Sequence, residues 1–557
     1  MKTRKHECTK INIMLLLLLL SISSFGQEKV IKNIILMIPD GTSWATVSSA
    51  RWYQWYNHPD LPYLNIDPHL CGSVLTFSSN APIGDSASTT SCYMTGVPSR
   101  AGWVATYPVV DPDNDILPLD TSKAYQPLMT LMEAAKIAQN KATGLVVTCE
   151  FPHATPADCA SHSYNRGKYE WIAPQMVHND IDVVFGGGTS ILNEECKQYL
   201  LNEGYELYLD DLAGFRNSTA SKMWSLFGTS AMAYDLERDT TQQPSLAEMT
   251  ATAIEKLSRN ENGFFLMVEG SQVDWAAHAN EPIAMITEML AFDKACGIAL
   301  DFAKKNGETV VIIVPDHGNS GISIGSNHCK VSYGTATKDD LFRNISQYQT
   351  TSARLSSIVK KTDPLQLKPV FKQYTGLELS GNEIETIMKC EDYSQSNLST
   401  KERTPGSSLN NTIASILNKN TCFGFTTRGH TGEEVFLAIY DPTNRRPTGF
   451  IHNTQLHQYM AKTMEMEGEL EHLTNTYFAK HTQVFEGLDY KILPAGGKNT
   501  GSTLQVKNKK NTLLIQPNTN LISLNGKTIR LNSVIVYVDR NKTFYLPAGL
   551  RSLVQSS

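Results

Sequence analysis

The sequence predicts an α/β fold with a mainly parallel central sheet flanked by helices. Five short apolar runs rich in Ile and Val are separated by stretches with helical patterns, at 33–39, 142–148, 182–185, 263–268 and 309–314. The runs are apolar throughout, as in strands buried on both faces, and their alternation with helices is typical of a parallel sheet. Four of the five runs are followed within two residues by an acidic residue.

The first 26 residues predict a secretory signal peptide. Lys2, Arg4, Lys5 and Lys10 precede an apolar run at 13–20, and small residues follow as far as Gly26. This run is shorter than the roughly 20 apolar residues of a membrane helix, and no later window of the sequence approaches that length. We therefore expect cleavage near Gly26 and a periplasmic or secreted protein without a membrane partner.

Composition and charge limit the remaining possibilities. The 557 residues are 41% hydrophobic and 19% charged, enough for one large globular domain with appendages. Removing residues 1–26 takes away four basic residues and one acidic residue, which changes the formal charge from −6 to −9. An acidic protein is a poor candidate for a nucleic acid as its main partner. Nine scattered cysteines remain, and their spacing predicts neither a zinc knuckle nor a particular disulfide framework.

Changes in composition divide the mature chain into a catalytic domain at 27–490 and a small all-β appendage at 491–557. Within the first, residues 330–426 are rich in Ser, Lys and Asn with helical patches, and we interpret them as an inserted cap region and a candidate lid. The appendage contains short β-type runs, and Asn525-Gly526 between two of them is typical of a type I′ hairpin turn.

Polar residues collect where the apolar runs end. Asp40 follows the first run, Glu269 the fourth and Asp316-His317 the fifth, while Thr155 lies shortly beyond the second. Ligands of parallel sheets bind beyond the carboxyl ends of the strands, so these residues are candidates for chemistry. Taken alone, an aspartate such as Asp40 at a strand end more often caps the next helix.

Several of these residues have the types and spacing of metal ligands. Asp274 and His278 are four residues apart and share one face of a predicted helix, a pairing that suits zinc. The alternative is an ordinary surface Asp–His pair. Gly318 allows the turn that Asp316 and His317 would need to bind one ion together. His430 precedes an apolar run, where a single histidine would more often be structural.

Ser86 is the candidate nucleophile. The segment 84–90 predicts a loop that enters a helix of small residues, with the Ser86 hydroxyl at the helix N-terminus. That position favours an anion. The alternative is an ordinary helix cap, for which Asp85 and Ser86 are both suitable.

Together these residues resemble the alkaline phosphatase family over about residues 32–460. The motifs that carry the resemblance occur in the family's order and approximate spacing: Asp40-Gly41, Asp85-Ser86-Ala87, His153-Ala154-Thr155-Pro156-Ala157, Arg166, Glu269 with Asp274 and His278, Asp316-His317-Gly318, and His430-Thr431-Gly432. Seven motifs in order make each structural alternative above much less probable.

The resemblance implies metal-dependent hydrolysis of phosphate monoesters through a phosphoserine on Ser86, with Arg166 binding the phosphate. It also implies two Zn²⁺ and one Mg²⁺. Asp274, His278 and His430 would hold the first zinc. The second zinc would be held by Asp40, Asp316, His317 and Ser86, and the magnesium by Asp40, Thr155 and Glu269. Oxygen ligands suit magnesium, and sets that contain nitrogen suit zinc.

Two positions differ from a well-studied bacterial branch of the family. His153 stands where that branch has Asp, and Trp275 stands where it has Lys. The loss of a cation beside the phosphate predicts weaker phosphate binding, and the histidine predicts a third site open to metals other than magnesium.

Three other functions agree less well with the sequence. A sulfatase would need a Cys/Ser-x-Pro-x-Arg motif, which does not follow Ser86. A phosphodiesterase of the same superfamily typically uses Thr as its nucleophile and lacks the magnesium site, and a non-catalytic phosphate- or metal-binding protein would be expected to have lost a ligand or the nucleophile. A homodimer is possible by analogy with relatives; the physiological alcohol is open.

Overall fold

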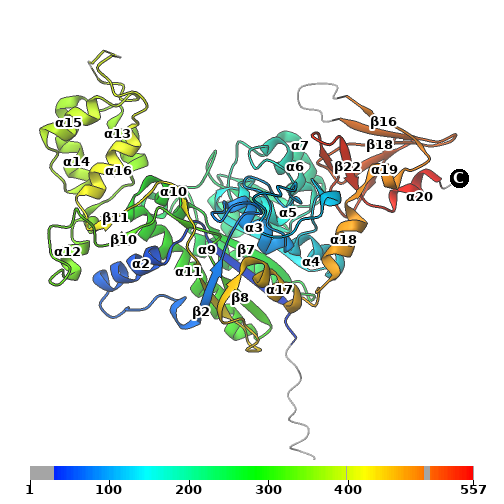
Figure 1. Ribbon diagram of the computed structural model, residues 1–557, viewed down its shortest axis with the longest axis horizontal. Helices are drawn as coiled ribbons and strands as arrows, with labels where there is room; N and C mark the ends of the chain where they lie inside the picture. Colours follow the sequence, from blue (N-terminus) through cyan, green and yellow to red (C-terminus); the bar gives the residue numbers. More distant parts are fainter. Residues whose placement is uncertain (1–29, 397, 400, 495–501, 556–557) are drawn as a thin grey trace, which may run out of the picture.

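The computed structural model describes residues 30–396, 398–399, 401–494 and 502–555. Its centre is a ten-stranded sheet (Figure 1). In spatial order the strands are β14 (Gly449–His452), β2 (Leu70–Leu75), β13 (Val435–Tyr440), β8 (Thr309–Ile313), β1 (Asn33–Pro39), β7 (Phe264–Gly270), β3 (Ala142–Glu150), β4 (Val183–Gly187), β6 (Met223–Leu226) and β5 (Glu206–Leu209). Only β13 runs antiparallel to its neighbours among these strands. The α/β prediction is confirmed, and the predicted signal peptide lies outside the described residues.

The central strands are apolar because both of their faces are covered. In β1, Ile34, Leu36 and Ile38 pack into one core, and the alternate residues Ile35 and Met37 pack into a second core on the other face. This alternation follows from the two-residue period of a strand. It fixes the register, so the ends of β1, β7 and β8 lie side by side.

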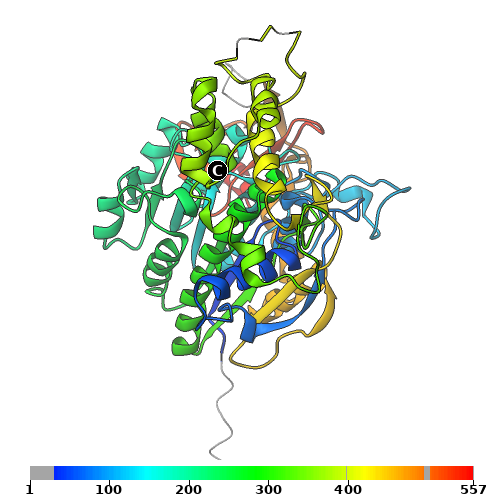
Figure 2. The same ribbon diagram turned by 90° about the vertical axis from the view of Figure 1, so that its left-hand side faces the viewer.

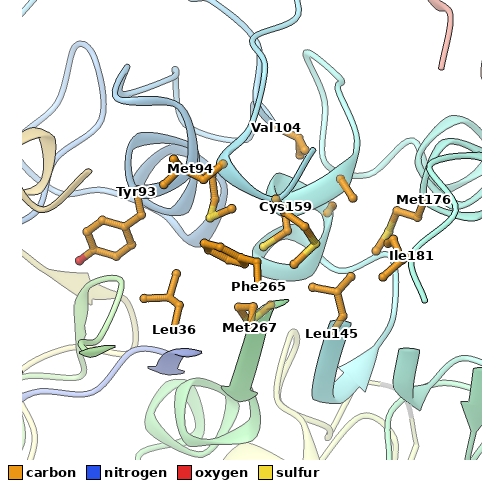
Figure 3. Packing of buried hydrophobic residues seen from close by; sticks show 14 of the residues in the cluster. Leu36, Tyr93, Met94, Val104, Leu145, Cys159, Met176, Ile181, Phe265 and Met267 are labelled. Carbon is orange, nitrogen blue, oxygen red and sulfur yellow. The ribbon is translucent and has the colours of Figure 1, made fainter. Parts of the chain in front are cut away.

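Helices form a layer on each face of the sheet. One layer contains α3 (Ser86–Thr95), α4 (Leu131–Gln139), α5 (Ala154–Ala160), α6 (Tyr169–His178) and α17 (Asn453–Thr463). The other contains α2 (Trp44–Asn57), α9 (Leu246–Leu257) and α11 (Pro282–Asn306). Figure 3 shows Tyr93 and Met94 of α3 packed over Leu36 and Phe265 of the sheet. This packing fixes α3, and with it the Ser86 end of that helix.

The inserted region is helical. It holds α12 (Lys338–Phe342), α13 (Ser352–Val359), α14 (Leu367–Thr375), α15 (Gly381–Met388) and α16 (Leu409–Lys419). A disulfide between Cys329 and Cys422, which are 93 residues apart, joins its two ends. Its core includes Ile283 and Met285 of α11, so the insertion packs against that helix rather than standing apart. Figure 2 shows it projecting from the sheet layers.

The chain ends in two small antiparallel sheets, on the side of the molecule opposite the insertion (Figure 1). The larger contains β16 (Asp489–Leu493), β17 (Thr503–Lys507), β18 (Thr512–Ile515), β19 (Leu521–Leu524) and β20 (Lys527–Arg530). The smaller contains β15 (Ala479–Lys480), β22 (Thr543–Leu546) and β21 (Val536–Val538). Asn525 and Gly526 have φ values of 53° and 85°, as a type I′ turn requires. We call these two sheets the C-terminal β unit; β15 shows that residues before 491 also belong to it.

A search of the described helices for one long and apolar enough to cross a bilayer finds none.

Candidate active site

The predicted site residues meet at the carboxyl edge of the sheet. Asp40 directly follows β1, Glu269 is the next-to-last residue of β7, and Asp316 follows β8. Thr155 lies in α5, just after β3, and α10 (Gln272–Ala279) supplies Asp274 and His278. Segments far apart in the sequence thus supply adjacent side chains, as expected for the ends of parallel strands.

Asp274, His278 and His430 form one compact group of metal-ligand type. Nε2 of His278 lies 3.4 Å from Oδ2 of Asp274 and 3.2 Å from Nε2 of His430. Asp274 is further oriented by the Asn319 amide, which donates to its Oδ1 over 2.6 Å. One carboxylate and two imidazoles around a common point match the donors that zinc prefers.

Asp40, Asp316 and His317 form a second, completely buried group. Nε2 of His317 lies 3.5 Å from Oδ1 of Asp40 and 3.3 Å from Oδ2 of Asp316. The other oxygen of Asp316 accepts hydrogen bonds from the backbone N–H groups of Gly41 and His317. Gly41 adopts φ 60°, and a side chain there would collide with Asp274. This glycine therefore permits the close approach of the two groups.

The three histidines share one orientation that favours a cation. Nδ1 of each contacts a backbone carbonyl: that of Arg428 for His278, of Gly84 for His430 and of Gly318 for His317. A carbonyl only accepts, so each Nδ1 must carry the proton and each neutral Nε2 presents a lone pair to the centre. Two lone pairs 3.2 Å apart, on His278 and His430, repel unless a cation lies between them.

A third group surrounds Glu269. Cys149, His153 and Glu269 offer donor atoms within 4.8 Å of one another, and the Cys149 thiol donates to Glu269 Oε2 over 3.4 Å. Among the described residues, Thr155 Oγ1, Glu269 Oε1 and Asp316 Oδ2 are buried without a hydrogen-bond partner. Buried oxygens are seldom left so, because an unsatisfied polar group costs about 1–3 kcal/mol. Divalent cations fit all three groups.

Ser86 is the first residue of α3 and is 2% exposed. Its Oγ lies 3.5 Å from both oxygens of Asp40 and 3.3 Å from Nε2 of His317. Asp85 caps the helix by accepting from the Ser88 N–H, and the Ser88 hydroxyl accepts from the Asp85 N–H in return. The capping that the sequence offered as an alternative therefore belongs to Asp85, which leaves the Ser86 hydroxyl facing the second group.

Arg166 lies beside Ser86, in the loop between α5 and α6. Its guanidinium donates to Oδ2 of Asp85 over 3.0 Å and contacts Nε2 of His153 at 3.1 Å. His153 in turn packs edge-on against Trp275, with ring centroids 5.8 Å apart. The two positions that differ from the bacterial branch thus touch each other, and one of them, His153, contacts the arginine.

Burial without countercharge dominates the electrostatics of the site. Burial, then the neighbouring Asp316, raises the pKa of Asp40 well above its usual value. Burial also raises the pKa of Glu269 to about 7. Burial and the nearby Arg166 lower the pKa of His153 to about 3, so that its imidazole is neutral. At Asp274 burial also acts to raise the pKa, but the neighbouring His278, His317 and His430 outweigh it and lower the pKa.

This geometry agrees with the comparison to known families. The family model described as alkaline phosphatase matches residues 31–466. The chain belongs to the alkaline phosphatase family. Alkaline phosphatase 3 of Bacillus subtilis strain 168 is 32% identical over 458 residues, which cover 79% of this chain and 90% of that protein. The repressible alkaline phosphatase of Saccharomyces cerevisiae is 29% identical over 529 residues, covering 82% and 85%.

Solved alkaline phosphatases share the fold. The cold-active enzyme of a psychrophilic Shewanella species superposes with a TM-score of 0.65 at 26% identity, covering 78% of this chain and 99% of that one. The Thermus thermophilus alkaline phosphatase gives 0.67 at 22% identity, covering 79% and 92%. The chain is therefore an alkaline phosphatase-type enzyme that acts on phosphate monoesters and depends on metal ions.

Two contacts in the alkaline phosphatase site were not predicted from the sequence. Cys149 lies against Glu269 because it is the next-to-last residue of β3, the neighbour of β7, so the strand-end rule could have found it. Asp85 was considered only as a helix cap, yet its second oxygen also binds Arg166 and the Gly102 N–H. Nothing in the local sequence signals that second role.

Proposed function

We propose that the chain hydrolyses phosphate monoesters through a covalent phosphoserine on Ser86, releasing the alcohol first and inorganic phosphate second. The observation that carries this proposal is the buried Ser86 hydroxyl at the start of α3, within 3.5 Å of Asp40 and His317. A hydroxyl in that position faces ligands that fit a divalent cation and has Arg166 nearby to hold the phosphoryl oxygens.

We assign two Zn²⁺ and one Mg²⁺ to the three groups. Asp274, His278 and His430 would hold one zinc, and Asp40, Asp316 and His317 with Ser86 the other. Magnesium would be held by Asp40, Thr155 and Glu269, and the unpartnered oxygens of Thr155 and Glu269 support this assignment. Bound there, the cations would lower the pKa of the serine hydroxyl and of water and would stabilise the departing oxygen.

The protein's own groups orient each step. Arg166 can grip two phosphoryl oxygens with its planar guanidinium, in addition to the positive end of α3. Ser86 Oγ gives up its proton to solvent and bonds to phosphorus as the bond to the alcohol oxygen breaks, and the departing oxygen takes up a proton from solvent. A water then loses a proton and bonds to phosphorus from the side opposite Oγ, the phosphorus–Oγ bond breaks, and Oγ is protonated again. Two displacements retain the configuration at phosphorus.

His153 and Trp275 should change phosphate binding and the choice of metal at the third site. Neither supplies a cation to the phosphate, since burial and Arg166 keep His153 neutral and Trp275 replaces a lysine. We therefore expect weaker phosphate binding and faster product release than in relatives with the lysine. The imidazole of His153 and the thiol of Cys149, both close to Glu269, favour a third site that also accepts softer cations than Mg²⁺.

We also propose a location, a domain division, a substrate class and an assembly for the chain. Residues 1–26 would direct export to the periplasm or outside the cell and be removed. Residues 27–490 would form the catalytic domain, with 330–426 as its inserted cap and 491–557 as the β appendage. Small phosphate monoesters would be the substrates, without nucleic acid or membrane as main partners. A homodimer would be compatible with the family.

Trapping the intermediate tests the mechanism. The metal-loaded enzyme is mixed with a ³²P-labelled monoester, quenched in acid within milliseconds and digested for peptide mapping. Label on the peptide that contains Ser86 is expected, and Ser86→Ala should remove it while leaving slow hydrolysis above background. Label on any other residue, or none under burst conditions, would count against the proposal.

Arg166→Ser tests the substrate class. A monoester offers two free oxygens to the guanidinium, whereas a diester has one of them blocked. The substitution should lower kcat/KM for an aryl monoester about 10²- to 10³-fold and leave weak diesterase activity nearly unchanged. A phosphodiesterase would instead prefer the diester before mutation, and an equal loss on both substrates would make Arg166 structural.

A further inference from the structure

The C-terminal β unit contacts the loop that carries Arg166. Asp539, directly after β21, accepts a hydrogen bond from the Tyr164 hydroxyl over 2.6 Å through Oδ1. Its Oδ2 lies 3.3 Å from Nζ of Lys168. Tyr164 and Lys168 are two residues before and two residues after Arg166, so one carboxylate from 375 residues away ties both sides of the arginine.

Neighbouring contacts strengthen this attachment. Nζ of Lys168 also donates to the Tyr164 hydroxyl over 2.8 Å and lies 3.4 Å above the Trp171 ring. The guanidinium of Arg540 lies 5.0 Å from the centre of the Tyr164 ring. Asp539 is therefore the acidic centre of a cation–π and hydrogen-bonded cluster, which restricts the side chains that flank Arg166.

The Arg166 loop, residues 161–168, connects α5 to α6 without a helix or longer strand. Its first part is held to the rest of the chain by a short bridge from Ser163 to Val104 and by hydrogen bonds between the His162 backbone and the Gln175 side chain. Next to the guanidinium-bearing side chain, the Arg166 N–H donates to the Gly102 carbonyl over 2.7 Å. Gly102 in turn donates to Asp85, the residue that pairs with the Arg166 guanidinium. The loop position thus decides where the guanidinium meets the phosphate.

We propose that Asp539 is a positioning residue: through Tyr164 and Lys168 it holds the loop so that Arg166 meets the phosphoryl group in its two-pronged geometry. This inference rests on the phosphate-binding role proposed above for Arg166. The family match ends at residue 466, so the positioning element lies outside the segment that the family shares. The C-terminal β unit is then part of the catalytic apparatus of this chain.

The contact is well suited to this role because it contributes little to folding. The Asp539 side chain is 46% exposed and that of Lys168 19%. Ion pairs with such exposure stabilise a fold by only about 0–1 kcal/mol. Displacing a catalytic group by about 1 Å can nevertheless cost up to about 10²-fold in rate. Loss of Asp539 should consequently affect catalysis more than stability.

The same β unit offers a matched control. Arg530, the last residue of β20, pairs with Asp180 at 2.7 Å and also with Glu203. These two acids lie just beyond the C-terminal ends of α6 and α7 (Glu194–Asn202), whereas the Arg166 loop precedes the start of α6. Its side chain is 41% exposed, close to that of Asp539. Arg530→Gln therefore breaks an equally exposed ion pair between the same two parts of the chain without touching the loop.

The experiment compares Asp539→Ala, Asp539→Asn and Arg530→Gln with the parent enzyme, all metal-loaded and with metal content measured. Asp539→Ala should lower kcat/KM for an aryl monoester about three- to thirtyfold and weaken inhibition by inorganic phosphate in parallel. Asp539→Asn keeps one acceptor oxygen, so its kcat/KM and its inhibition by phosphate should lie between those of the parent enzyme and those of Asp539→Ala. Arg530→Gln should change neither by more than about twofold, and all thermal midpoints should stay within a few degrees.

A double-variant cycle with Arg166→Ser decides whether Asp539 acts through Arg166. In that background Asp539→Ala should cost less than about twofold, because the group it positions is gone. Losses that multiply in the double variant, or a diester rate that falls as much as the monoester rate, would overturn the inference. Should Asp539→Ala not fold, the Asp539→Asn series decides by the same criteria.

The two proposals can fail separately. If Arg166→Ser is damaging while Asp539→Ala resembles Arg530→Gln, the positioning role is wrong and the proposed function stands. If Arg166→Ser spares monoester turnover, the phosphate-binding role fails and takes the positioning role with it.

Discussion

Two sets of buried carboxylates in this enzyme differ in their hydrogen-bond partners. The first, which we call the centre carboxylates, comprises Asp40, Glu269 and Asp316 at the ends of β1, β7 and β8. The second, the helix carboxylates, comprises Glu281, Glu288 and Asp293 at the start of α11 and within it. All six are at most 3% exposed. Burial alone therefore does not tell them apart.

The helix carboxylates are satisfied by backbone N–H groups. Glu281 accepts from the Ser352 N–H and bonds to its hydroxyl, both over 2.6 Å. Glu288 accepts from the Asp235 N–H over 2.5 Å, and Asp293 accepts from the N–H groups of Asn65 and Ile66. Each of these carboxylates joins α11 to a segment that is distant in the sequence. Their role is therefore structural.

The centre carboxylates instead keep oxygens that no donor in the described chain reaches, on Glu269 and on Asp316, and they face one another. The pKa shift does not discriminate, because burial raises the pKa to about 7 at both Glu269 and Glu281. What discriminates is the satisfaction of the oxygens. A buried acid whose buried oxygens all have donors is structural, and a cluster of buried oxygens without donors indicates a cation.

Removing the metals should have the largest effect. Prolonged chelation is expected to lower monoesterase activity by at least about 10³-fold, since several kcal/mol of barrier reduction depend on the cations. The midpoint of thermal unfolding should fall as well, because ligands of the folded state stabilise it and the centre carboxylates would repel one another. Zinc with magnesium should restore both. Full activity of a preparation shown metal-free by mass spectrometry would contradict the assignment.

A matched pair of isosteric substitutions tests the comparison directly. Glu269→Gln and Glu281→Gln each replace one fully buried acid by its amide, twelve positions apart. Glu269→Gln should lose about one bound metal per chain and lower kcat by about 10²-fold or more. Glu281→Gln should keep the metal content and change kcat less than about twofold, because an amide can still accept from the Ser352 N–H and donate to its hydroxyl.

Metal analysis and steady-state kinetics on the two variants provide the measurement, with circular dichroism as the check on folding. Equal losses of metal in both would mean that satisfied and unsatisfied carboxylates cannot be distinguished by their hydrogen bonds, and the comparison would be wrong.

Strands that are buried on both faces could be located from the sequence. The runs at 33–39 and 309–314 correspond to β1 (Asn33–Pro39) and β8 (Thr309–Ile313) within one residue. Strand β2, which lies second from one edge of the sheet, was not predicted, because Leu70-Cys71-Gly72-Ser73 has neither a continuous apolar run nor strict alternation. Its pairing with β13 and β14 is decided by tertiary packing.

The site residues could be predicted from the sequence because the ends of parallel strands bring functional side chains to one edge of the sheet, and the family resemblance indicated how these residues group. The long-range contacts could not be predicted. Cys329 and Cys422 pair across 93 residues, and Asp539 meets Tyr164 across 375. No periodicity or motif in one segment specifies which loop of another it will touch, since such contacts follow from the assembled fold.

The smallest effect expected is a change in the pH dependence of stability at Glu288. Burial raises the pKa of Glu288 to about 8, from an ordinary value of 4.5 in the unfolded chain. Between these two values the folded state keeps a proton that the unfolded state has lost. The free energy of unfolding must therefore fall as pH rises through this window and level off above it. The neutral acid's contribution is complete below pH 4.5 and lost by about pH 8.

Glu288→Gln should remove this dependence, because glutamine resembles the protonated acid and can still accept from the Asp235 N–H. Relative to the parent, the variant should be about equally stable at pH 5 and more stable at pH 9, by on the order of 1–3 kcal/mol. Metal-saturated urea unfolding at both pH values measures the difference, with the exposed Glu467→Gln as control for general charge effects. If Glu288→Gln were no more stabilising at pH 9 than at pH 5, the carboxyl would already be ionised at pH 5 in the folded protein. Its single backbone donor would then offset the whole cost of burial, and hydrogen-bond satisfaction would govern the ionisation of the helix carboxylates as well as their role.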